Sequence, residues 1–255
     1  VLVPLILIAV VVGLFIGAVG VGGVALPPFL TWFLGFDPHL AAGTSSWSFL
    51  FTGVVGTLMY ARGGAIRWRL VGSLTLGAAP AAFLGSQVNG MVPAQYALLP
   101  LAVLVAAAGI YNLTSTCRAA VRPDRGTRPV RATLSTRAAA SVGAVVGFAS
   151  ALTGTGGPVF LIPILLAIGV PVLTAIAAAQ VIQIPLVLFA VAGFASQGAV
   201  DFVAGTAIGL IAGGGVVFGA SIAMRLPSAT LHRVAGYCLV GFGMLLLAVT
   251  LLGLS

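Results

Sequence analysis

Two glycine clusters are the residues whose types and spacing most clearly suggest a binding chemistry. Residues 19–23 read Val-Gly-Val-Gly-Gly and residues 153–157 read Thr-Gly-Thr-Gly-Gly. Three glycines within four residues break a helix, which frees backbone N–H groups, and a following half-helix offers its positive N-terminal end. Such donors bind anions, and glycine allows close backbone approach. The candidate residues are Gly20, Gly22 and Gly23, with Thr153, Gly154, Thr155, Gly156 and Gly157.

Close helix packing is the alternative explanation for these glycines, because small residues let membrane helices approach one another. A single cluster would favour packing. Here there are two, and each is followed by a short apolar segment with prolines, at 27–28 and at 158 and 163. Paired breaks of this kind are typical of transporter sites, so we interpret the clusters as halves of one anion site.

Polar side chains follow each glycine cluster along the chain. In the first half they are hydroxyls near the start of the next apolar span, with a tryptophan among them, and in the second half they are two glutamines. Both sets can donate hydrogen bonds to an anion. The hydroxyl groups could instead bond to carbonyl groups of their own helix. The two glutamine side chains are costlier to bury in an apolar span, which favours a functional role for them. The candidates are Thr44, Ser45, Ser46, Trp47, Gln180 and Gln183.

The composition places these residues in lipid. Sixty per cent of the 255 residues are hydrophobic and five per cent are charged, against roughly a quarter charged in a soluble domain. All eleven positively charged residues are arginines, and they lie beside apolar spans. This position favours anionic lipid headgroups over nucleic acid as their binding partner. No metal, cofactor or catalytic motif is present, and no carboxylate falls at a predicted bilayer centre, so we expect a non-enzyme.

The apolar spans occur in two similar halves. We expect helices near 1–19, 24–36, 40–61, 70–92 and 94–115, and again near 138–153, 158–169, 172–196, 201–224 and 228–254. A shift of 134 residues places eight of the sixteen glycines in the first 121 residues on glycines of the second half, which indicates an internal duplication. The predicted domains are a first repeat, 1–116, a basic cytoplasmic linker, 117–137, and a second repeat, 138–255.

The arginines favour one of two topologies. If the repeats are parallel four-span units, nine arginines are cytoplasmic and Arg225 and Arg233 lie outside. If each glycine cluster is the tip of a re-entrant hairpin, the repeats are inverted and all eleven are cytoplasmic. We therefore predict an all-α polytopic membrane protein with two inverted repeats, each with a glycine-tipped re-entrant or broken helix plus three long transmembrane helices.

These motifs resemble the TauE/SafE family of membrane proteins over essentially the whole chain. The resemblance rests on residues 20–23 (Gly-Val-Gly-Gly) with prolines 27–28, on 42–45 (Ala-Gly-Thr-Ser), and on 154–158 (Gly-Thr-Gly-Gly-Pro) followed by 161–163 (Leu-Ile-Pro). The second half departs from the pattern, because 177–180 reads Ala-Ala-Ala-Gln in place of a Thr-Ser pair. The family implies export of small sulfur-containing anions, such as sulfite or sulfonates, from a bacterial cell.

The residues and the resemblance together predict a multi-pass transporter of the bacterial inner membrane with an anion site at the midplane. An anion channel, or a permease for a different small anion, is the alternative. The expected partners are a small anionic substrate and the lipid bilayer, and neither nucleic acid nor a cofactor is expected. A homodimer is compatible with the sequence.

Overall fold

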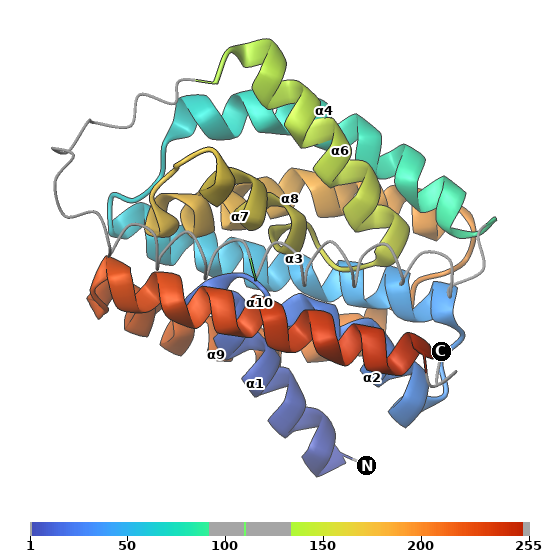
Figure 1. The fold of residues 1–255 in the computed structure, drawn as a ribbon. Coiled ribbons are helices and arrows are strands. Elements are labelled where there is room, and N and C mark those ends of the chain that lie inside the picture. Colours follow the sequence, from blue (N-terminus) through green and yellow to red (C-terminus); the bar gives the residue numbers. More distant parts are fainter. Residues whose placement is uncertain (1, 92–109, 111–133, 252–255) are drawn as a thin grey trace, which may run out of the picture.

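The computed structural model describes residues 2–91, 110 and 134–251, and within these ranges every regular element is helical. The predicted span 94–115 and most of the predicted linker 117–137 lie outside the described residues. The elements, shown in Figure 1, are α1 (Leu2–Val19), the 3-10 helix η1 (Gly22–Ala25), α2 (Leu26–Leu34), α3 (Pro38–Arg62), α4 (Trp68–Asn89), α6 (Thr136–Thr153), α7 (Pro158–Ala167), α8 (Val172–Ser196), α9 (Phe202–Arg225) and α10 (Ser228–Leu251).

The helix bounds recur at the spacing that aligns the glycines. Adding 134 to the bounds of α1 gives those of α6, and adding 134 to those of α3 gives those of α8. The start of α4 falls in the same way on the start of α9. The short η1 and α2 correspond in order to α7, so the described parts of the two halves follow the same sequence of elements.

Short polar side chains set several helix starts, as the carboxylates near the span ends predict. Asp37 accepts a hydrogen bond from the N–H of His39 at 2.9 Å, and Asp201 accepts from the N–H groups of Val203 and Ala204 at 3.0 and 2.9 Å. Each side chain satisfies donors that a helix start leaves unpaired. Both aspartates therefore act as N-terminal caps of their helices.

Glycines bring the helices of the two halves into close contact. A Cβ at Gly13 on α1 would collide with the backbone of Ala212 on α9, and a Cβ at Gly147 on α6 would collide with that of Ala78 on α4. These two contacts are related by the same 134-residue shift. The helices α3 and α8 lie at the centre, where each contacts the other and one of the outer pairs.

The direction of each helix follows from its contacts. Along α3, Gly43 meets Phe194 and Gly56 meets Gln180, so α3 and α8 are antiparallel. The helix α9 is parallel to α3, because Gly205 lies against Thr44 while Gly213 lies against Val55. The arginine-bearing ends of α3 and α9 consequently lie at the same end of the bundle, where Gly63 contacts Met224.

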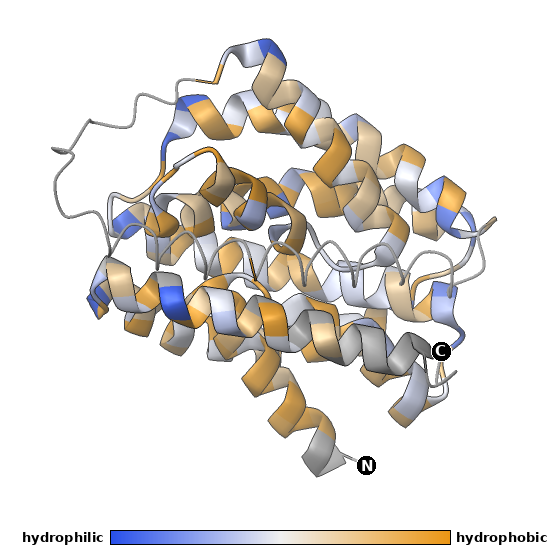
Figure 2. Cartoon of the chain, in the orientation of Figure 1, coloured by the Kyte–Doolittle hydropathy of each residue, from blue (hydrophilic) through white to orange (hydrophobic). Residues whose placement is uncertain are grey.

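Many large apolar side chains are exposed on the bundle. Figure 2 shows hydrophobic residues along all the helices, with the most hydrophilic ones mainly near helix ends and loops. Soluble proteins rarely expose continuous apolar surface of this extent, whereas lipid requires it. By length and composition, three of the described helices, α6, α8 and α9, can cross a membrane, and shorter apolar stretches cover Leu5–Val19, Gly22–Leu34 and Pro158–Ala167. Exposed examples are Leu7, Leu58, Leu76, Leu84, Val145, Leu210 and Phe218.

Replacing Gly13 with leucine should destabilise the protein by about 3 kcal/mol, because the colliding atoms belong to the backbone of α9 and cannot rotate away. Gly147→Leu should behave alike. Gly214→Leu is the matched control, since Gly214 lies on α9 with no atom within 4 Å of an added Cβ. Thermal unfolding in detergent measures the difference, and equal midpoints for Gly13→Leu and Gly214→Leu would contradict the packing described.

Candidate functional site

Each glycine cluster reverses the chain at the end of a helix. After α1, Gly20 adopts a left-handed φ of +75°, and Gly22 packs back on Val12 and Phe15. After α6, Gly156 has a φ of +81°, in the region that side chains other than glycine rarely adopt. The helical segments η1 and α7 then begin. We call the segments 20–23 and 154–157 the first and second tips.

The two tips meet. The carbonyl oxygen of Thr155 in the second tip lies 2.9 Å from the position that a Cβ on Gly23 in the first tip would occupy. Gly20 similarly lies against the side chain of Ile162 on α7. Residues more than 130 positions apart in the sequence therefore form one junction.

The ring of Phe49 on α3 lies between the tips. A Cβ on Gly23 would lie 3.1 Å from Cζ of Phe49, and a Cβ on Gly156 would lie 2.5 Å from Cδ2. The side chain is buried, with 1% of its surface exposed. Both tips therefore need glycine for two reasons, the reversal of the chain and the closeness of this ring.

A closed space remains at the junction, and its lining comes from both halves. It is too small to hold a water molecule, so the structure represents a closed conformation. None of its described lining residues is charged, and the positive N-terminal ends of η1 and α7 lie beside it, since Gly23 and Pro158 are among the lining residues. The lining residues are Ile16, Gly20, Gly23, Phe49, Thr155, Pro158 and Gln183.

The two glutamines hold the backbone around this space. The Nε2 group of Gln180 donates to the carbonyl oxygen of Ile16 at 2.8 Å. The Nε2 group of Gln183 donates to the carbonyl oxygen of Phe49 at 2.8 Å and to Oγ1 of Thr52 at 2.9 Å. The Oε1 atoms of both glutamines are buried and have no hydrogen-bond partner among the described residues.

The hydroxyl groups of Thr44, Ser45 and Ser46 on α3 form hydrogen bonds with backbone groups. Ser45 donates to the carbonyl oxygens of Ala42 and of Gly154, each at 3.0 Å, which ties α3 to the second tip. Oγ1 of Thr44 accepts from the N–H of Asp201 at 2.9 Å. The two remaining candidates bond elsewhere: Ser46 donates to Ala42 and Trp47 donates to Thr206.

The predicted residues therefore fall into three groups. Those that line the space are Gly20, Gly23, Thr155 and Gln183. A second group contacts or holds the lining. Gly156 lies against Phe49, the hydroxyl of Thr153 lies 3.0 Å from that of Thr155, and Gly157 directly precedes α7. Ser45 and Gln180 hold the backbone by the hydrogen bonds described above. Gly22, which packs against the backbone of Ile16, and Gly154, whose carbonyl accepts from Ser45, also belong to this second group. Those that lie apart from the space are Thr44, Ser46 and Trp47.

Phe49 is the main lining residue that the sequence analysis missed. As an aromatic in an apolar span it carries no chemical signal of its own. The repeat offset could have found it, since 134 residues before Gln183 is Phe49. Ile16 and Pro158 were missed as lining residues for the same reason, because apolar residues occur throughout a membrane protein and do not by themselves indicate a binding site.

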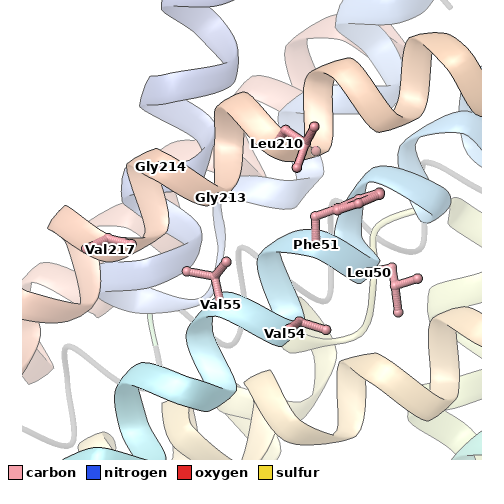
Figure 3. A pocket seen from close by; sticks show the side chains of 9 residues that line it. Leu50, Phe51, Val54, Val55, Leu210, Gly213, Gly214 and Val217 are labelled. Carbon is pink, nitrogen blue, oxygen red and sulfur yellow. The ribbon is translucent and has the colours of Figure 1, made fainter.

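A larger hollow of about 440 Å³ lies between α3 and α9 and has a different character. Figure 3 shows its lining, which consists of glycines and apolar side chains such as Phe51, Val55 and Leu210. Without polar groups it offers nothing to bind an anion. The junction of the tips is thus the better candidate for a substrate site.

The apolar exterior, the long helices and the paired broken segments define a multi-pass helical membrane protein of the transporter class. The family model described as sulfite exporter TauE/SafE matches residues 5–252. The chain belongs to the TauE/SafE family, and the resemblance of its motifs is confirmed.

Curated relatives agree with this assignment. A protein of Xylella fastidiosa named "Probable membrane transporter protein" is 28% identical over 236 residues, which cover 90% of this chain and 88% of the relative. A protein of Sinorhizobium fredii named "Probable membrane transporter protein y4hK" is 31% identical over 132 residues, or 52% of this chain and 51% of the relative. No solved structure matches the chain significantly. The family and these relatives are membrane transporters, not enzymes.

Proposed function

We propose that this protein exports a small sulfur-containing anion, such as sulfite or an organosulfonate, across the bacterial inner membrane through the junction of the two tips. One observation carries the proposal. The N-termini of two helical segments lie beside a small space, and none of its described lining residues is charged. Positive helix ends and backbone N–H groups of the tips without a neutralising carboxylate suit an anion of low charge.

Two inverted repeats provide the framework in this proposal, with domains at 1–116 and 138–255 joined by a cytoplasmic linker at 117–137. Three observations support inversion. The helix bounds recur at an offset of 134, the corresponding helices α3 and α8 run antiparallel, and the ends of α3 and α9 that carry Arg62 and Arg225 lie together. The last observation favours the topology in which all arginines are cytoplasmic.

Transport requires the junction to open, because the described conformation has no room for a ligand. Movement of one repeat against the other would expose the tips first to one side and then to the other. The membrane potential drives an anion out of a cell with a negative interior, by about 2.3 kcal/mol per charge at 100 mV. Export by this route needs no buried carboxylate.

Uptake of sulfite and short sulfonates into liposomes containing the purified protein tests this function. Chloride, sulfate and phosphate serve as controls. Saturable uptake that prefers sulfur anions would support the proposal, and currents far above the turnover of a carrier would assign the same junction to a channel. Uptake of phosphate or chloride with equal preference would refute the substrate class and leave a permease for a different anion.

A further inference from the structure

Gln183 is the only amide side chain that lines the junction within the described part of the chain, and its donors are already used. Its two N–H bonds are directed to the carbonyl oxygen of Phe49 and to Oγ1 of Thr52. The atom left over is Oε1, which is an acceptor. It lies buried in a residue with 1% of its surface exposed, and none of the described residues gives it a hydrogen bond.

Thr155 presents the same kind of atom. The hydroxyl of Thr155 lies 3.0 Å from that of Thr153. When Thr153 donates its proton to the carbonyl oxygen of Ala149, 2.9 Å away, Thr155 is the donor of this contact. The oxygen of Thr155 keeps its lone pairs. Oε1 of Gln183 is thus an unsatisfied acceptor at the junction. The donors beside it are backbone N–H groups of the tips, such as those of Gly23 and Gly157, which make no hydrogen bond within the described residues.

An acceptor without a donor in a buried site costs about 1–3 kcal/mol, and a fully deprotonated oxyanion would worsen this by placing its own lone pairs against Oε1. A ligand that carries both negative oxygens and one O–H group satisfies both sets of atoms. Its charged oxygens face the helix starts, and its O–H donates to the amide oxygen.

We infer that the anion bound at this junction keeps one proton, so that the substrate is a monoprotonated oxyanion such as hydrogen sulfite, with its O–H donating to Oε1 of Gln183. The inference rests on the proposed function and narrows its substrate class. It excludes as good ligands both the sulfite dianion and sulfonates, which have the charge but lack the proton.

The pH dependence of binding then arises from the ligand, because no titratable side chain of the described residues lines the junction. The helices packed against α8 do carry titratable groups, and α10 also includes His232. Of those with described side chains, none is a lining residue: His39, Tyr60 and Arg62 on α3, Arg69 on α4, Arg137 on α6, and Arg233, Tyr237 and Cys238 on α10.

Calorimetric titration of the detergent-purified full chain with sulfite, at pH values on both sides of its second ionisation, tests the inference. The affinity for total sulfite should fall on the order of tenfold per pH unit above that ionisation, as the monoprotonated form disappears. Methanesulfonate is the matched ligand control, since it has one negative charge and no ionisable proton. It should bind at least about tenfold more weakly at low pH, because one hydrogen bond is missing, with little dependence on pH.

Gln183→Met provides the matched variant, because methionine has a similar length and lacks the amide oxygen. It should bring the affinities for hydrogen sulfite and methanesulfonate together. A sulfite affinity that stays constant or rises with pH, or methanesulfonate binding as tight as that of sulfite, would overturn the inference and leave the exporter proposal in place. The absence of binding by any sulfur anion at every pH would instead remove the exporter proposal itself.

Discussion

Replacing Gly156 with valine is expected to weaken anion binding strongly and to slow transport. The backbone there has a φ of +81°, which costs a residue with a Cβ about 1–2 kcal/mol. The new Cβ would also lie 2.5 Å from Cδ2 of the Phe49 ring, and overpacking of this kind costs about 1–3 kcal/mol more. A total near 3 kcal/mol corresponds to a loss of about 100-fold in affinity.

Gly198→Val separates backbone strain from the clash at the tips. Gly198 has a φ of +69° and no atom within 4 Å of an added Cβ, and it lies between α8 and α9. This variant should lose some thermal stability and keep its affinity for sulfite. Liposome uptake and calorimetry measure both variants. Equal sulfite affinities for Gly156→Val and Gly198→Val would show that the second tip does not contribute to binding.

Replacing Phe49 with alanine is expected to make the protein leak. The ring lies between Gly23 and Gly156 in a junction that has no room for water, so it forms part of the barrier in the closed conformation. Its removal should raise passive sulfite flux on the order of tenfold, for which a barrier lowered by about 1.4 kcal/mol suffices. The cavity should also destabilise the protein by about 3–5 kcal/mol.

Phe194→Ala is the control for that loss of stability. Phe194 is equally buried, with 1% of its surface exposed, and it lies on α8 against Gly43 without lining the space at the junction. It should cost similar stability without raising flux. Efflux from liposomes loaded with sulfite measures the leak. A leak of equal size in both variants would show general loosening, and no leak in Phe49→Ala would show that the ring is not the barrier.

The two halves share a framework and differ in chemistry at the junction. At the offset of 134, Gln183, Thr155 and Ser150 of the second half correspond to three residues of the first half. These are Phe49, Val21 and Ile16, in the same order. The second half supplies the polar partner in each pair, and the first half supplies the apolar one. The departure of the second half from the Thr-Ser pattern is consistent with this division, because the hydroxyls of α3 bond to backbone groups rather than lining the space.

The sequence by itself determined the helices, the lipid environment, the two breaks and the family. Each of these is a local or periodic property: an apolar span of sufficient length must be helical in lipid, and clustered glycines break a helix wherever they occur. The bounds of α8, for example, equal the predicted span 172–196, since its apolar run and its ends are both local.

Only the tertiary structure decided which of the candidate residues meet. Phe49 and Gln183 are 134 positions apart, and nothing local indicates that the ring of one lies between the tips while the amide of the other holds its carbonyl. The sequence likewise could not tell that the N–H groups of Gln183 are used within the protein. Hydrogen-bond partners depend on which helix faces pack together, and that packing decides whether a buried amide presents a donor or an acceptor.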